Sequence, residues 1–364
     1  MRALIVARRL ALVAAGALAM PAHAAIAQSL ASRIDAIREG TVELSFASRP
    51  GVCGDGYDMI RWGRVTHMLP GSTSFGRNDD WRECVRGPVR VSIGRSSGEV
   101  ISVRTRVADR SSRRNDDTFT YLGTVSAAEA ARYFLGLAPS LGERNAQYAL
   151  AAAVFADSVD IVPNLARLIH RDDVRRSTRQ SAIFWLASID ENTVSPLLRG
   201  FVTDERLDME LRGSAIIALG RDDISDDDID FLRRFYPTAN EQLKDKIFLA
   251  VHGSDDPKVS RWLASVVTNG DESMEVRRQA LFWMGQGHGP LADLTRLYDQ
   301  VQDRSLREHF TFVLSQRHES GAVEKLIDIA RNDTDRDIRR QAFFWLGQSK
   351  DERARNFLRE VLVK

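Results

Sequence analysis

The sequence predicts a mainly α-helical protein, with an α-solenoid of about seven helical hairpins over residues 141–364 and a small β-rich module before it. Three observations lead to this prediction. A segment recurs along the C-terminal part at a near-constant interval, apolar residues alternate in the N-terminal part, and both cysteines lie in that N-terminal part. With 364 residues, 43% of them apolar and 28% charged, the chain is long enough for two cores and too apolar for disorder.

The first 27 residues have the pattern of a cleavable secretory signal. Three arginines precede an apolar run over residues 10–20, and small residues follow. The run is shorter than the roughly 20 residues that a membrane-spanning helix needs, so an uncleaved anchor is the weaker interpretation. We expect cleavage after Ala27, with Ala24 as the next candidate, and a periplasmic or secreted protein that is not inserted in a membrane.

Cys53 and Cys84 are the two cysteines of the chain. Because an exported protein folds in an oxidising compartment, we expect them to pair as a disulfide. Closing a loop of about 30 residues would contribute roughly 3 to 4 kcal/mol in the chain-entropy model. A reactive thiol pair is the competing interpretation, but the spacing is not C-x-x-C and no histidine lies near either cysteine.

The module, residues 28–140, is expected to combine helices and strands. Residues 28–39 place their apolar side chains on one helical face. Strands are predicted at residues 41–47, at residues 119–122 and in a hairpin over residues 89–103. Ser126, followed three residues later by Glu129, predicts the capping box of a further helix.

Two stretches of the module allow a ligand-binding interpretation. The glycines around Cys53 lack the G-x-x-x-x-G-K-[ST] pattern, so a turn held by the disulfide is favoured over a phosphate site. Four acids there could in principle bind calcium, but their spacing matches no calcium-binding loop. They are Asp55, Asp58, Asp79 and Asp80. Arginines 110, 113 and 114 could meet an anionic partner, although a solvated loop over residues 109–117 is the simpler expectation.

One segment recurs almost unchanged in the C-terminal part, at residues 179–186, 278–284 and 340–346. Weaker copies fill the gaps. We take the last apolar residue of each copy as its anchor. The anchors are Leu186, Leu219, Val251, Met284, Leu314 and Leu346, which are 30 to 33 residues apart. A period of 20 to 50 residues is typical of stacked structural units.

Each anchor has the same surroundings. The position seven residues before it is always basic: Arg179, Arg212, Lys244, Arg277, Arg307 or Arg339. A polar turn and a second amphipathic helix follow it, so the unit is a helical hairpin. Because neither helix can bury its apolar face alone, stacked neighbours would form one continuous core. Residues 144–170 are a degenerate first unit, which makes about seven units in all.

This pattern, clearest at residues 338–347, resembles the HEAT-repeat family, and in particular the short bacterial HEAT-like repeats that also occur in phycobilisome lyases. The resemblance covers roughly residues 142–364. It implies a right-handed superhelix that acts as a scaffold. It also implies that the recurring basic residue is structural and bridges adjacent repeats through an acid. The candidate acids are Asp172, Asp271, Asp303 and Asp335.

The chain departs from that family two residues before each anchor, where such repeats are usually polar. Here the six residues are large and apolar: Phe184, Ile217, Leu249, Phe282, Phe312 and Phe344. At about 100° per residue this position lies about 200° from the anchor, nearly on the opposite side of the helix. Either neighbouring elements cover these side chains in a thicker core, or they form an exposed apolar ridge that binds a partner.

Nothing in the sequence has the pattern of a catalytic, cofactor or metal site. The histidines after residue 27 are scattered without ligand spacing, and no G-x-S-x-G nucleophile motif is present. Without the first 27 residues the chain has 48 basic and 50 acidic residues, which argues against nucleic-acid binding.

We therefore expect an exported, non-enzymatic scaffold or adaptor that binds a protein or peptide partner through the solenoid, with the six apolar residues as binding candidates. Two alternatives stay open. One is an envelope-signalling sensor or regulator, in which the module senses and the solenoid relays. The other is a lyase-type enzyme, which the HEAT-like relatives suggest although no residue here matches such a site.

Overall fold

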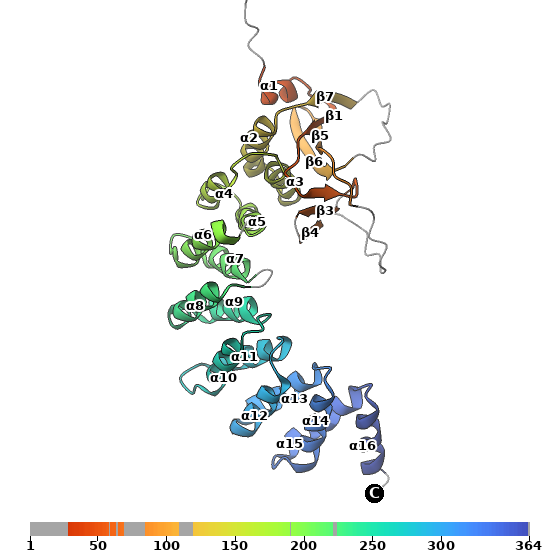
Figure 1. Cartoon of the computed structure of the whole chain (residues 1–364), viewed down its shortest axis with the longest axis vertical. Helices are drawn as coiled ribbons and strands as arrows, with labels where there is room; N and C mark the ends of the chain where they lie inside the picture. Colours follow the sequence, from red (N-terminus) through yellow and green to blue (C-terminus); the bar gives the residue numbers. More distant parts are fainter. Residues whose placement is uncertain are drawn as a thin grey trace, which may run out of the picture.

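The computed structural model describes residues 28–362, except for residues 58, 63–64, 69–83, 109–118, 190 and 221–223. The predicted signal peptide, the loop over residues 109–117 and three of the four candidate calcium ligands, Asp58, Asp79 and Asp80, lie outside the described residues. The described chain forms a β module at one end of a curved stack of helix pairs (Figure 1). This is the mainly helical fold, with a small β module, that the sequence predicts.

The larger sheet of the module has four strands in the order β6-β5-β1-β7. They are β1 (Gly40–Phe46), β5 (Val89–Ser96), β6 (Glu99–Val107) and β7 (Phe119–Thr124). The predicted hairpin is β5 and β6, and its turn residues Ser97 and Gly98 have φ angles of 53° and 82°, as tight hairpin turns require. β1 pairs antiparallel with β5 and parallel with β7, so it is central and buried on both faces from Val42 onward.

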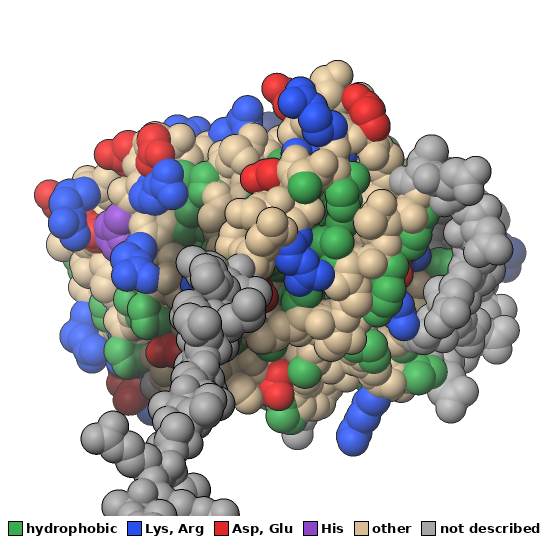
Figure 2. All heavy atoms as spheres, turned by 90° about the horizontal axis from the view of Figure 1, so that it is seen from above, with side chains coloured by type: hydrophobic (Ala, Val, Ile, Leu, Met, Phe, Trp, Pro, Cys, Tyr) green, Lys and Arg blue, Asp and Glu red, His purple; other side chains and the backbone are tan. Residues whose placement is uncertain are grey.

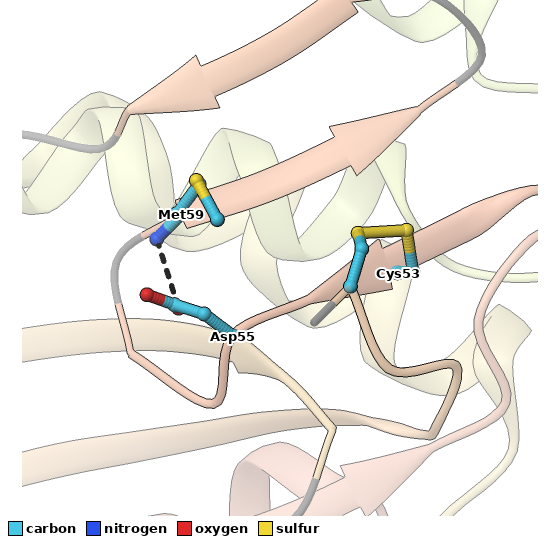
Figure 3. The surroundings of a disulfide bond; sticks show 4 residues. Cys53, Asp55 and Met59 are labelled. Carbon is cyan, nitrogen blue, oxygen red and sulfur yellow. Dashed lines mark hydrogen bonds between the residues drawn. A yellow bond between two sulfur atoms is a disulfide. The ribbon is translucent and has the colours of Figure 1, made fainter. Parts of the chain in front are cut away.

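A second sheet, in the order β2-β3-β4, occupies a stretch that the sequence indicated only as turn-rich. Its strands are β2 (Val52–Gly54), β3 (Met59–Trp62) and β4 (Val65–Met68). The predicted disulfide joins Cys53 of β2 to Cys84, beside a backbone bridge between Gly54 and Val85 (Figure 3). The buried Asp55 carboxylate accepts the backbone N–H of Tyr57 at 2.8 Å and of Met59 at 3.4 Å, so it stabilises the turn between β2 and β3.

The module also has two helices, α1 (Leu30–Asp35) before the first strand and α2 (Ala127–Leu137) after the last, and a 3-10 turn, η1 (Ala138–Ser140), leads from α2 to the stack. Ser126 caps α2 as expected, by accepting the backbone N–H of Glu129 at 3.2 Å. The predicted capping box is wrong in its second half. Glu129 instead accepts the backbone N–H of Leu30 at 2.7 Å, so this acid caps α1 and joins the two helices.

Seven helix pairs follow within the described residues. They are α3 (Glu143–Val154) with α4 (Val162–Ile169), α5 (Arg176–Leu186) with α6 (Glu191–Thr203), α7 (Met209–Leu219) with α8 (Asp226–Phe235), α9 (Glu241–Val251) with α10 (Pro257–Thr268), α11 (Met274–Gln286) with α12 (Leu291–Gln300), α13 (Arg304–Ser315) with α14 (Ser320–Asn332), and α15 (Arg336–Gln348) with α16 (Glu352–Leu362). A 3-10 turn, η2 (Tyr236–Thr238), follows α8. The number of pairs agrees with the sequence period.

Side-chain caps fix where the first helix begins in the five pairs from α7 onward. Ser273 accepts the backbone N–H of Val276 at 3.3 Å, and Asp303 accepts that of Leu306 at 3.1 Å. The cap lies eleven residues before the anchor in five successive first helices, at Asp208, Asn240, Ser273, Asp303 and Asp335. This constant offset keeps the equivalent faces of the first helices in register.

One core runs through module and stack. All six anchors are buried, and a single cluster of buried side chains extends from Leu30 to Phe357. The junction is aromatic, because the ring of Phe155 lies 6.2 Å from that of Trp62 and 5.3 Å from that of Trp185. Arg49 adds a polar link, since its Nε donates to the carbonyl of Val154 at 2.6 Å. The module therefore covers the first hairpin.

The stack bends toward its first helices. Successive first helices from α3 to α15 pack closely against one another, whereas neighbouring second helices make far fewer contacts. Figure 1 shows the resulting curve, with the first helices from α5 to α13 on its inner side. Among the described residues, no helix is both long and apolar enough to cross a bilayer.

Candidate functional site

The inner side of the curve carries a groove whose floor is built from equivalent positions. These lie two, five, six and nine residues before each anchor, so they form one stripe along an α-helix. In α7 they are Ile217, Ser214, Gly213 and Glu210; in α11 they are Phe282, Gln279, Arg278 and Glu275; in α13 they are Phe312, His309, Glu308 and Ser305. The stripes of adjacent helices form a continuous surface because the caps hold the helices in register.

Two hollows lie along this groove in the described part of the chain, and α9 lines both. The smaller has a volume of about 180 Å³ and lies between α5, α7 and α9, with Gln180, Glu210, Ile217 and Lys246 among its lining residues. The larger has a volume of about 510 Å³ and reaches from α9 to α15. Its lining residues are Asp245, Glu275, Arg278, Gln279, Phe282, Trp283, Ser305, Glu308, His309, Phe312 and Gln341.

Of the six predicted ridge residues, Ile217, Phe282 and Phe312 line the two hollows, and the other three occupy the equivalent positions of their helices. Phe184, Ile217 and Phe344 are exposed, with accessible fractions of 45%, 37% and 52%. Leu249, Phe282 and Phe312 are half-buried. The rings of Phe282 and Phe312 stack with centroids 6.4 Å apart, and Phe312 lies 5.4 Å from the ring of Trp345. The middle of the ridge is thus supported by neighbouring side chains, while both ends are open.

The larger hollow has more acid than base in its lining. Asp245 accepts the indole N–H of Trp283 at 3.0 Å. Glu308 accepts the Nε of Arg304 at 3.1 Å. Glu275 accepts the side-chain amide of Gln279 at 3.3 Å and forms no ion pair with any described residue. Arg278 is the one guanidinium that lines the hollow among the described residues.

Two buried polar atoms on the floor lack a hydrogen-bond partner among the described residues, Oε1 of Gln279 and Nε2 of His309. Burial, and then the positive charge of Arg278, lower the pKa of His309 from 6.5. The imidazole is therefore uncharged at neutral pH. Because a buried polar atom without a partner costs free energy, these two atoms favour a bound molecule or water in the hollow.

The recurring basic residue has a structural role in every described repeat. Arg212 and Arg277 each donate a 2.8 Å hydrogen bond from Nε to a backbone carbonyl, that of Val202 or Val267. Those carbonyls lie at the C-terminal ends of α6 and α10, where helix carbonyls lack partners within the helix. Arg179 does the same for the carbonyl of Ile169 at 2.6 Å. Arg339 reaches the carbonyl of Thr334 after α14, at 3.1 Å.

The family resemblance implies that the recurring basic residue bridges repeats through an acid. Such bridges occur, but most of the acids are not the ones expected. Asp172 does pair with Arg179, at 3.3 Å. Asp303 and Asp335 instead cap α13 and α15. The acids that bridge to the next repeat are Glu272, 2.7 Å from Lys244, and Asp333, which pairs with Arg307. Side-chain direction decides these pairs, and the linear spacing alone does not reveal it.

No family model and no curated protein matches the chain. Among solved structures, it is similar to human deoxyhypusine hydroxylase in complex with glycerol, at 17% identity and a TM-score of 0.26, over 68% of this chain and 74% of that chain. A TM-score this low carries no argument about fold or function. The helical hairpins are established by the structure itself, and the likeness to HEAT repeats remains a resemblance. In the described part of the chain, no three metal-binding side chains cluster.

Proposed function

We propose that this protein is an exported scaffold or adaptor that binds a protein or peptide partner along its inner groove. The observation that carries the proposal is the stripe of four equivalent positions repeated on successive first helices, with a large apolar side chain always at one of them. A long, repetitive surface of this kind suits an extended polypeptide better than a small molecule, which is usually enclosed in a single concave pocket.

Export is supported by two features. The first 27 residues have the signal pattern, and Cys53 and Cys84 form a disulfide. Disulfides persist in oxidising compartments, so a periplasmic or secreted location accounts for both features.

The proposal includes no catalytic step, cofactor or metal ion. His309 is the imidazole of the larger hollow, and its Nε2 has no partner among the described residues. A histidine that acts as a general base is hydrogen-bonded to its nucleophile, and no described hydroxyl or thiol is bonded to this Nε2.

The module exposes further apolar side chains, which are separate candidate contacts rather than one patch. Tyr57, Ile101 and Tyr121 are exposed, with accessible fractions of 51%, 60% and 52%. Figure 2 shows the module end of the molecule, where apolar side chains lie between basic and acidic ones. A mixed surface of this kind is typical of transient protein contacts.

The first test compares exposed apolar residues on the two sides of the stack. We expect Phe184→Ser, Ile217→Ser and Phe344→Ser together to abolish partner capture from an envelope or culture extract, because they remove the open ends of the ridge. Val361→Ser is the matched control, since Val361 is 42% exposed on α16, outside the groove. All four side chains are exposed, so melting temperatures should hardly change. Undiminished capture by the triple variant would overturn the proposal.

A further inference from the structure

We propose that the larger hollow binds a cationic side chain of the partner, arginine in preference to lysine, presented by an extended segment that lies along the ridge. This inference rests on the proposed function and specifies what the groove recognises. Three features of the hollow support it: its charges, its open acceptors and its aromatic rings.

The charge of the hollow favours a cation. Three carboxylates line it, those of Asp245, Glu275 and Glu308, against the single guanidinium of Arg278. That guanidinium is already engaged, because it donates to the hydroxyl of Ser305 in the adjacent helix. His309 adds no positive charge at neutral pH, since burial and Arg278 lower its pKa. Lys246 and Arg304, which do not line this hollow, pair with Asp245 and Glu308, so Glu275 is the carboxylate without a cation among the described residues.

Two acceptors in the hollow remain open. Among the described residues, Oε2 of Glu275 and Oε2 of Glu308 accept no hydrogen bond. These atoms belong to the facing stripes of α11 and α13. A guanidinium has five N–H donors in a planar fork and can serve acceptors on two sides, whereas an ammonium is a compact point charge. The set of acceptors therefore favours arginine.

The aromatic rings add a second reason for arginine. Phe282 and Phe312 stack with planes 5° apart, and the ring of Trp283 lies 5.1 Å from that of Phe282. All three rings line the hollow beside the carboxylates. A guanidinium can lie over such rings through cation–π attraction while its edge meets a carboxylate. Apolar residues on either side of the arginine would then contact the ridge.

The hollow is also open along the groove, which favours an extended segment over a free cation. The adjacent α9 residues Asp245 and Lys246 line the larger and the smaller hollow, and Ile217 of α7 lines the smaller one. A polypeptide could therefore place its arginine between α11 and α13 and continue past α9 toward α7.

The test uses defined peptides and the full mature chain. The probe is an acetylated, amidated pentapeptide in which an arginine is flanked on each side by phenylalanine and leucine. Its counterparts carry citrulline, which has nearly the same shape without the charge, or lysine. Calorimetry should show that the arginine peptide binds at least about tenfold more tightly than the citrulline peptide. This preference should weaken as the salt concentration rises.

Two sets of variants locate the site. Glu275→Gln with Glu308→Gln preserves side-chain size and should remove the preference for arginine over citrulline. Glu324→Gln is the matched control, because Glu324 has an exposed side chain on α14, a second helix outside the groove, and it should leave the preference intact. Unchanged melting temperatures would show that each variant is folded.

Equal binding of the arginine and citrulline peptides, or no binding of either at about 1 mM, overturns the inference. A preference that survives Glu275→Gln with Glu308→Gln also overturns it, because the site would then lie elsewhere. The proposed function fails separately, if partner capture does not depend on Phe184, Ile217 and Phe344. Ridge-dependent capture combined with equal peptide binding would overturn this inference alone.

Discussion

Individual side chains in the groove have roles that depend on their neighbours rather than on their type. Phe282 and Phe344 are equivalent in the repeat, yet Phe282 stacks on Phe312 and is half-buried, whereas Phe344 is 52% exposed. Sequence periodicity could place both on the inner face. It could not separate them, because exposure depends on which neighbouring side chains pack against each ring.

His309 should make the stability of the stack depend on pH. Its pKa in the folded chain is lowered from 6.5 by burial and by Arg278, so the unfolded chain binds the proton more readily. The stabilisation is fully present above pH 6.5 and is lost as the pH falls below it. We expect His309→Asn to reduce the loss of melting temperature between pH 7 and pH 5, as measured by circular dichroism.

His288→Asn is the control for that prediction, because His288 has a side chain that is 69% exposed, on a turn. It should leave the pH dependence unchanged. If His309→Asn and the unsubstituted chain lose the same melting temperature on acidification, the role assigned to His309 is wrong.

At the scale of elements, local patterns predicted local structure. The hairpin of β5 and β6 and the helix pairs were found because alternation and the helical period are visible within a few residues. The small sheet of β2, β3 and β4 was missed because its strands are three or four residues long. Its position depends on the Cys53–Cys84 disulfide and on pairing of Gly54 with Val85, which are contacts between distant residues.

The recurring basic residue joins one element to the next, so its loss should weaken a specific junction. Arg277→Ala leaves the carbonyl of Val267 at the end of α10 without its partner. Because an unsatisfied buried carbonyl costs about 1 to 3 kcal/mol, we expect a loss of that size in the free energy of unfolding. Urea unfolding followed by circular dichroism would measure it.

Arg340→Ala is the comparison for Arg277→Ala. The Arg340 side chain is 79% exposed and pairs with Asp337 within the same helix, so its removal should change stability by less than about 0.5 kcal/mol. Equal losses for the two variants would contradict the structural role of the recurring residue.

At the scale of the whole molecule, the module and the stack share one core. Phe155 contacts both Trp62 of the module and Trp185 of the second hairpin. We therefore propose that the module, expected from the sequence as residues 28–140, acts as the N-terminal cap of the solenoid. The sequence indicates two regions but not this junction, since the residues that form it are far apart along the chain.

The candidate site, too, could be predicted from the sequence only in part. The period placed the ridge on the face opposite the anchors, and the equivalent polar positions that complete the groove follow from the same period. The charge balance of the larger hollow could not be predicted from the period, because it requires α9, α11 and α13 to lie side by side.

The most direct test of the inner groove as the binding surface is photo-crosslinking in living cells. A photoreactive phenylalanine analogue would replace Phe344 on α15 in one strain and Val361 on α16 in another, since both side chains are exposed in the same hairpin. The account predicts a partner adduct from position 344 and none from position 361. Adducts of equal yield from both positions, or an adduct from position 361 alone, would contradict it.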